Sequence, residues 1–287
     1  MSEFTKTLIV DCEAVDMVDN GDFSTTDTWV LGDNWSISNS RATRSPSAPG
    51  SSISQTITFI QGKEYTIKYS VYTAAQAEGY FHLQGSFGNQ TIASTVGEHT
   101  YIFTCQNTSN SLSFFLDATY EISIEYVSVL EGRTFLTINE AVVQLGSAGG
   151  RIVVEQGSYA VTDTIYLPNN TTIIGSGAVT INVSTNISLF KNSESGQDGR
   201  CRFSISGMKI NMTMQSGYQR NMIHFTAVTN SVFDNLTFTV TTAGAVASGY
   251  AAIKLEGYVN ECSGNIITGC NISGYDIGIS LKGFNVT

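Results

Sequence analysis

The chain has 287 residues, enough for two domains, and its 41% apolar content is ample for buried cores. Only 13% of the residues are charged and the formal net charge is −10, which argues against a nucleic-acid backbone or an anionic membrane surface as partner. No apolar run is long enough to span a membrane, and the opening MSEFTKTLIV lacks the pattern of a signal peptide. A neutral ligand fits this composition best.

Residues 1–19 fit neither of the domains that follow, and we expect them to form an N-terminal arm. Residues 20–132 alternate between apolar and polar in short runs separated by turn residues, which is typical of an antiparallel β-sandwich. In EISIEYVSVL the alternation changes phase, which predicts a bulge at Glu125 and Tyr126. In EYTIKYSVYT, alternation predicts an inward-facing set of Tyr65, Ile67, Tyr69 and Val71.

Three segments of this domain carry a family resemblance: NGDFSTTDTWVLGDNWSIS, GKEYTIKYSVYT and ISIEYVSVLEG. Their order resembles the jelly-roll carbohydrate-binding modules that accompany polysaccharide-degrading enzymes and phage tail proteins. The resemblance covers residues 20 to 131 and implies that Trp29 and Trp35 pack in the core. Relatives commonly have Asp where this chain has Glu125, so the resemblance leaves a structural calcium ion open. No other cofactor is expected.

A sugar-binding face needs flat aromatic side chains beside polar ones, because sugars present both apolar C–H faces and hydroxyl groups. Alternation places four such residues on the polar side of two consecutive strands, with Lys68 and Phe115 as neighbours. The alternative is that the tyrosines only line a solvated or interdomain face. The predicted carbohydrate-binding residues are Tyr72, Tyr80, His82 and Gln84.

One short helix is predicted after the sandwich. Thr137 and Glu140 have the spacing of a capping box, and Gly146 is placed to end the helix. A helix of about two turns is unstable alone in water, so its apolar stripe must pack against another element. That stripe consists of Ile138, Ala141, Val142 and Leu145.

The rest of the chain repeats two strand patterns at spacings typical of a solenoid. One pattern is Ile187-Ser-Leu189, Ile223-His-Phe225, Ile253-Lys-Leu255 and Ile279-Ser-Leu281. The other is Ile205-Ser-Gly-Met208-Lys-Ile210, Phe233-Asp-Asn-Leu236-Thr-Phe238 and Ile267-Thr-Gly-Cys270-Asn-Ile272.

The helix, the segment GGRIVVEQGSYAV and the repeats resemble the start of the right-handed parallel β-helix of the pectate-lyase-like superfamily and of phage tailspikes. This resemblance covers residues 133–287 and implies that the helix plugs the first coil. The predicted fold class is therefore all-β, a jelly-roll sandwich followed by a parallel β-helix. The last repeat runs to Thr287 without a closing element, so we expect that the polypeptide continues or that partner chains cover this end.

No catalytic constellation is visible in the predicted solenoid. Its acidic residues form no adjacent pair of the kind that glycoside hydrolysis requires, and Glu256, next to a strand, is the least ordinary of them. His224 is expected to be a solvated, outward-facing side chain. The five cysteines have no metal-ligand spacing, so we interpret them as packing thiols and predict no metal site among them.

These features favour a virion tail spike or fibre, assembled as a homotrimer with other tail proteins, that attaches to host cell-surface polysaccharide. The first alternative is a polysaccharide depolymerase, a lyase or glycoside hydrolase, whose catalytic coils lie on the β-helix or beyond residue 287. The second is a bacterial cell-surface or secreted protein exported without a leader. The identity of the glycan is left open by the sequence.

Overall fold

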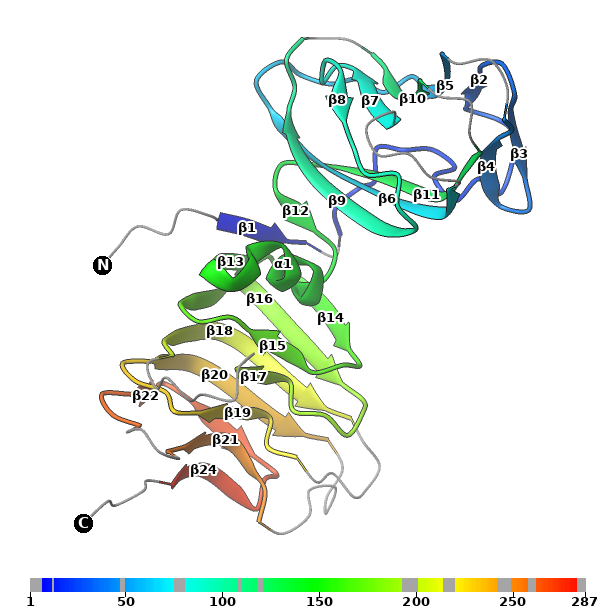
Figure 1. Ribbon diagram of the computed structural model, residues 1–287. Coiled ribbons are helices and arrows are strands. Elements are labelled where there is room, and N and C mark those ends of the chain that lie inside the picture. Colours follow the sequence, from blue (N-terminus) through cyan, green and yellow to red (C-terminus); the bar gives the residue numbers. More distant parts are fainter. Residues whose placement is uncertain are drawn as a thin grey trace. The chain divides into compact units, whose positions relative to one another are not determined.

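The computed structural model is drawn in Figure 1 and describes residues 7–11, 13–46, 50–74, 81–107, 110–117, 121–192, 201–213, 220–241, 249–257 and 262–282. The chain divides into two compact units. One unit combines Met1–Glu13 with Phe135–Thr287, and the other is Ala14–Thr134. The chain therefore begins in one unit, builds the whole of the other, and then returns.

The unit Ala14–Thr134 contains two five-stranded antiparallel sheets. Sheet B has the order β2 (Val30–Leu31), β5 (Ser51–Gln55), β10 (Leu112–Leu116), β7 (Phe81–Gly85) and β8 (Gln90–Thr91). Sheet C has the order β3 (Trp35–Ser38), β4 (Arg41–Arg44), β11 (Ile122–Glu131), β6 (Glu64–Ala74) and β9 (Gly97–Thr104).

One hydrophobic core holds the two antiparallel sheets together. The predicted inward set of β6 is buried, and Tyr69 from that set meets Phe114 of β10 at a ring-centroid distance of 5.6 Å. Trp29 and Trp35 are buried in the same core, as predicted. The register of β11 on β6 shifts so that Glu125 has no partner, which confirms the predicted bulge.

The other unit is built on two sheets. The strands of sheet A are β12 (Thr134–Phe135), β1 (Thr7–Val10), β13 (Gly150–Val154), β16 (Thr171–Val183), β18 (Phe203–Met212), β20 (Val232–Val240) and β22 (Ile266–Thr268) in that order, with β14 (Gly157–Val161) on β16 and β23 (Asn271–Ser273) on β20. Sheet D has the order β15 (Ile165–Leu167), β17 (Phe190–Asn192), β19 (Ile223–Thr226), β21 (Ala251–Glu256) and β24 (Ile277–Lys282).

The first strand corrects the prediction for residues 1–19. Thr7–Val10 pairs in parallel with Arg151–Val154 of β13, and Leu8 and Val10 are fully buried. Residues 7–10 are therefore part of sheet A and not of a separate arm. The four-residue strand shows no repeat with the residues that follow it, because its partner lies far along the chain.

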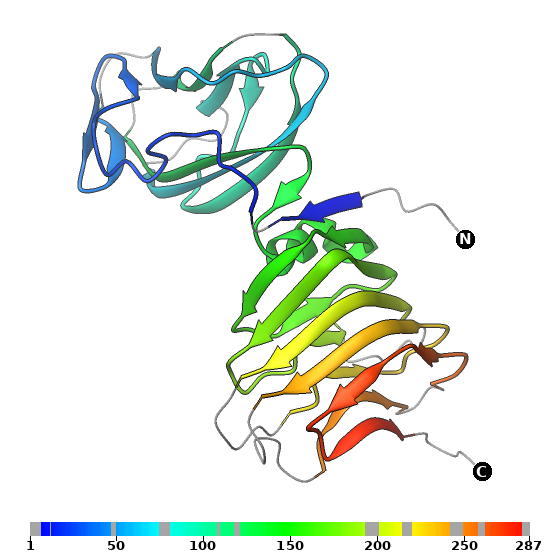
Figure 2. The same ribbon diagram turned by 180° about the vertical axis from the view of Figure 1, so that it is seen from behind.

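From β15 onward the chain alternates between sheets D and A, and Figures 1 and 2 show the successive strands of sheet A side by side. Ile223, Ile253 and Ile279 are in register across sheet D, and Ile205, Phe233 and Ile267 are in register across sheet A. The predicted repeats are confirmed, with one correction. The partner of Ile223 is Phe190, so the first strand of the sheet D repeat begins three residues after Ile187.

Left-handed residues recur at one level of sheet A, where its strands bend. Gly207, Asn235 and Gly269 have φ values of 71°, 50° and 61°, and the residues that flank them pair between β18, β20 and β22. A Cβ atom on Gly207 would also lie 2.9 Å from the Gly175 carbonyl oxygen. Both the backbone angle and the close approach therefore require glycine at residue 207.

The helix α1 (Ile138–Leu145) has the predicted capping box. The Glu140 backbone N–H donates to the Thr137 hydroxyl at 3.2 Å, and the Thr137 N–H donates to the Glu140 carboxylate at 3.3 Å. Its apolar stripe is buried, and α1 packs against β1, β13 and β15. A short 3₁₀ turn, η1 (Gly146–Ala148), follows the helix.

Candidate functional site

The predicted sugar-binding residues do not share one face. Tyr72 lies on β6 in sheet C, whereas His82 and Gln84 lie on β7 in sheet B. Tyr80 lies outside the described residues. Consecutive strands usually pair, but β6 and β7 have different partners, β11 and β9 for the first and β10 and β8 for the second. The structure therefore brings together His82 and Gln84 and leaves Tyr72 on the other sheet.

Tyr72 is already in contact with a cation. The Arg41 guanidinium carbon lies 3.4 Å from the centre of the Tyr72 ring, and 47% of the tyrosine remains exposed. The pairing of β6 with β11 is irregular at this point, since Thr73 and Val71 have partners and Tyr72 has none. One face of the ring is thus occupied by Arg41.

His82 and Gln84 point to the outer face of sheet B, because Phe81 and Leu83, which alternate with them along β7, are buried. Phe115 of β10 is the direct partner of His82, and their rings lie 6.3 Å apart with a tilt of 37°. The predicted neighbour Phe115 therefore belongs to this face, while Lys68 lies on sheet C and pairs with Glu98 at 3.6 Å.

Two cross-strand rows make up this face of sheet B. The first runs Thr91, His82, Phe115 and Ser52, and the second runs Gln84, Ser113, Ser54 and Val30. No residue in either row carries a formal charge, with His82 counted as neutral. The Thr91 hydroxyl lies 3.3 Å from His82 Nδ1, and the Gln84 amide N–H donates to Asn89 Oδ1 at 3.3 Å. The face is therefore polar and aromatic but uncharged.

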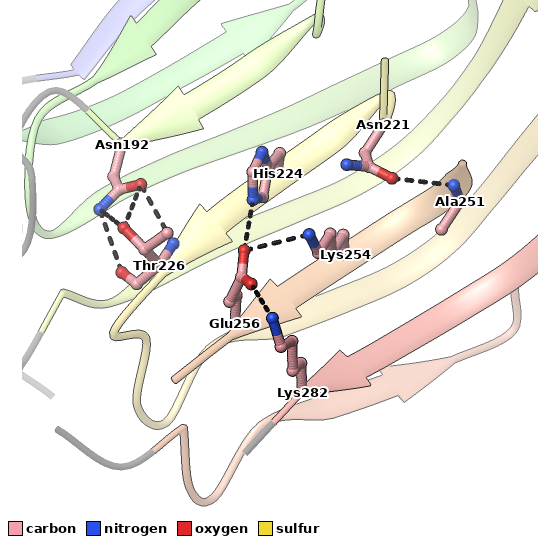
Figure 3. A network of polar contacts seen from close by, with 8 residues as sticks. All are labelled: Asn192, Asn221, His224, Thr226, Ala251, Lys254, Glu256 and Lys282. Carbon is pink, nitrogen blue, oxygen red and sulfur yellow. Dashed lines mark hydrogen bonds and ion pairs between the residues drawn. The ribbon is translucent and has the colours of Figure 1, made fainter. Parts of the chain in front are cut away.

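A second polar cluster lies on the outer face of sheet D, centred on Glu256 (Figure 3). Glu256 Oε2 lies 3.2 Å from His224 Nε2 and 3.1 Å from Lys254 Nζ, and Glu256 Oε1 lies 3.1 Å from Lys282 Nζ. Only 12% of the Glu256 side chain is exposed. The expectation that His224 is a solvated side chain is corrected, because three strands place the side chains of His224, Lys254, Glu256 and Lys282 against one another.

The protonation states in this cluster follow from its contacts. Burial alone would raise the pKa of Glu256, but hydrogen bonds from Lys254, Lys282 and His224 outweigh it and hold the pKa at about 2. Burial lowers the pKa of His224, and Lys254 lowers it further against the opposing effect of Glu256. Because a carboxylate only accepts hydrogen bonds, the neutral imidazole carries its proton on Nε2.

Glu256 is therefore an ionised acceptor with partners on both carboxylate oxygens, and it is unsuited to general acid catalysis, which needs a raised pKa. Within the five strands of sheet D, no second acidic residue accompanies it on the outer face. The Glu256 carboxylate instead holds the Lys254 ammonium group in place.

The lysines around this cluster were not among the predicted site residues. Lys191, His224 and Lys254 occupy one position in three successive strands of sheet D. The Ile-x-Leu pattern predicts this strand at Ile187–Leu189, whereas the strand of sheet D is Phe190–Asn192. The difference hides the alignment of Lys191 with His224 and Lys254. A register correction of three residues is enough to bring Lys191 into line.

The described residues also bear on the predictions about metal sites, cysteines and membrane spans. Among the described residues, no group of three or more His, Cys, Asp or Glu side chains is placed to hold a metal ion, and structural calcium in the antiparallel unit stays a prediction. Cys105, Cys201, Cys262 and Cys270 are free thiols. No helix in the described part of the chain is long and apolar enough to cross a membrane.

No family model and no curated protein matches the chain. A solved structure described as "CBM4 structure and function" has 16% sequence identity, covers 40% of this chain and 99% of its own, and gives a TM-score of 0.32. A mutant of a family 29 carbohydrate binding module has 12% identity, with coverage of 42% and 85% and a TM-score of 0.29. A β-glucosidase from Kluyveromyces marxianus in complex with glucose has 13% identity, with coverage of 47% and 19% and a TM-score of 0.18.

Proposed function

We propose that this chain is a component of a virion tail spike or fibre that attaches to host cell-surface polysaccharide, with the outer face of sheet B as a site for neutral sugars. The observation that carries the proposal is the juxtaposition of Phe115 and His82 with the amide of Gln84 and a border of serine and threonine hydroxyls. Aromatic rings take the apolar face of a pyranose, and the amide and hydroxyls take its hydroxyl groups.

The absence of formal charge from the two rows of this face supports a neutral ligand. Sheet C offers a contrast, since its outer face carries Arg41, Lys68 and Glu98. A neutral sugar on sheet B would require no desolvation of an ionised side chain, which is the main cost of placing a polar ligand on a charged surface.

The finer parts of the proposal concern architecture. We propose that the antiparallel unit has jelly-roll topology and that sheets A and D are the walls of a right-handed parallel β-helix capped by α1. The in-register repeats and the chain's alternation between the two sheets support the latter. A homotrimer in the virion tail, next to other tail proteins, is the proposed assembly, and light scattering of the purified chain tests its oligomeric state.

The experiment is a neutral glycan array with the full chain, followed by calorimetry on the best ligand. His82→Ala combined with Phe115→Ala should weaken binding about ten-fold or more, since each stacking surface contributes about 1 kcal/mol. Tyr72→Ala is the matched control, because it removes an exposed aromatic side chain from the other sheet. Equal affinity of the wild type and the double variant, or no neutral glycan bound at all, contradicts the proposal.

The depolymerase alternative is separated by the products. An adhesin leaves a capsule polysaccharide at full length, whereas a lyase or hydrolase releases oligosaccharides that chromatography detects. The low pKa of Glu256 excludes it only as a general acid, so the product assay decides between the two functions. Release of oligosaccharides by the full chain would contradict the adhesin proposal and favour the depolymerase.

A further inference from the structure

One row of outward side chains runs across all five strands of sheet D. Strand pairing places Tyr166 beside Lys191, Lys191 beside His224, His224 beside Lys254, and Lys254 beside Ser280. Neighbouring strands lie about 4.8 Å apart, so the backbones of Lys191 and Lys254 are about 10 Å apart along the stacking direction. The row therefore has the form of a track along the sheet and not of a single compact pocket.

A groove follows this row. It has a volume of about 600 Å³, and its lining side chains include two tyrosines and several basic groups. Arg220 and Tyr250 come from the segments just before β19 and β21, and they join the row residues at its side. Its aromatic and basic lining residues are Tyr166, Lys191, Arg220, His224, Tyr250 and Lys254.

The charge of the groove is opposite to that of the chain. The lining of the groove carries Lys191, Arg220 and Lys254 and, among the described residues, no carboxylate. Glu256, which pairs with Lys254, lies on the same face of sheet D outside this lining. The whole chain carries a formal net charge of −10, so this positive surface is a local exception. A basic surface on an acidic protein attracts an anionic ligand, and the negative charge of the rest of the chain directs that ligand to this surface.

The basic groups are held in place by a polar framework. Glu256 fixes the ammonium groups of Lys254 and Lys282, each at 3.1 Å (Figure 3). Asn221 Oδ1 accepts the Ala251 backbone N–H at 2.9 Å, and Asn192 Nδ2 donates to the Thr226 carbonyl oxygen at 3.1 Å. These side chains tie neighbouring strands together on either side of the row, so part of the ordering cost is met before a ligand binds.

We propose that the groove on sheet D binds an extended, carboxylate-bearing glycan, with its carboxylates against Lys191 and Lys254 and its sugar rings against Tyr166 and Tyr250. An extended ligand matches the length of the row, and tyrosines at its side match the apolar faces of sugars. A nucleic acid matches less well, because its dense phosphate charge is repelled by the acidic chain. This site is separate from the one on sheet B, and it stands if the sheet B site fails.

The test uses the full chain with oligomers of alginate and of hyaluronate, two polymers that carry carboxylates, and with their carboxyl-reduced counterparts, which keep the backbone and lose the charge. We expect at least one acidic oligomer to bind, its affinity to fall more than ten-fold on carboxyl reduction, and binding to weaken as salt is raised. Binding should also raise the pKa of His224, followed by NMR, because the glycan carboxylate adds a negative charge beside Lys191, Lys254 and Glu256.

The variant Lys191→Gln should lower the affinity for the acidic oligomer about five-fold, at the upper end of what a solvated ion pair contributes. Lys209→Gln is the matched control, since Lys209 is an exposed lysine on β18 of sheet A, and its affinity should be unchanged. Thermal melting establishes that both variants fold. The proposal is overturned if neither acidic oligomer binds, if reduced oligomers bind equally well, if both variants weaken binding alike, or if a single-stranded oligonucleotide of equal charge binds more tightly.

Discussion

The outer faces of sheet B and sheet D are both exposed sides of five-stranded sheets, yet they differ in charge. In sheet B, His82 lies between Thr91 of the next strand and Phe115 of the more distant β10, these positions do not repeat one another, and the face is uncharged. In sheet D, the strands repeat in parallel register, so Lys191 and Lys254 fall at one position of the repeat and their charges line up. A parallel repeat turns a preference at one position into a ladder, whereas an antiparallel sandwich builds a face from unrelated positions.

The largest expected effect on this comparison comes from a substitution that destabilises the unit of sheets A and D. Val142 on α1 is 5% exposed, and Val142→Asp places an unpaired charge against β13 and its neighbours. We expect the free energy of unfolding of this unit to fall by about 3 kcal/mol or more. Calorimetry should show a lower midpoint for one transition, and binding of the acidic glycan should be lost at temperatures where binding of the neutral glycan persists.

Val143 provides the control for this substitution. It is the next residue of the same helix but is 72% exposed, so Val143→Asp should leave both transitions within about 0.5 kcal/mol of the wild type. An unchanged midpoint for Val142→Asp would show that α1 is not needed to cover the parallel strands.

A smaller effect on sheet D is expected from acid. The pKa of Glu256 is about 2 in the fold and 4.5 ordinarily, so its ion pairs stabilise the fold above pH 4.5 and are lost as pH falls towards 2. We expect a loss of about 2 kcal/mol over this range, below the full value of the shift because Lys282 is solvated. His224, whose pKa is lowered, adds a separate loss that begins as pH falls below 6.5.

Glu256→Gln isolates this contribution. Denaturant unfolding of the variant at several pH values should show a flatter dependence between pH 4.5 and pH 2 than the wild type. Glutamine keeps a side-chain oxygen that accepts a hydrogen bond from Lys254 but loses the negative charge that neutralises Lys254 and Lys282, so the affinity for the acidic glycan should rise while that for the neutral glycan stays constant. The same pH dependence in both proteins would mean that Glu256 is not the titrating group.

The two faces also differ in how far the sequence predicts them. Alternation and capping are local signals, and they predict the buried set around Tyr69, the bulge at Glu125 and the capping box of Thr137. Strand partners are not local. Alternation places Tyr72 and His82 on outward faces, but it contains no information that β6 and β7 join different sheets.

The lysine ladder of sheet D was hidden by an ambiguity of register. Ile187 to Leu189 fits the apolar-polar-apolar pattern better than Phe190 to Asn192, because Asn192 is polar. Asn192 is nevertheless buried, since its amide hydrogen-bonds to Thr226 on the next strand. A buried polar residue that is satisfied by a neighbouring strand cannot be distinguished from a surface residue by pattern alone.

The smallest predicted effect concerns Tyr72, which lies on sheet C and belongs to neither proposed site. Its ring stacks with Arg41, whose Nε has no hydrogen-bond partner among the described residues. We expect a double-mutant cycle of Tyr72→Ala and Arg41→Gln to give a coupling energy of about 0.5–1 kcal/mol in denaturant unfolding. Tyr72→Phe should retain most of it, because phenylalanine keeps the ring face. Neither variant should change the affinity for neutral or acidic glycans, and a loss of neutral-glycan binding in Tyr72→Ala would move the sugar site from sheet B to sheet C.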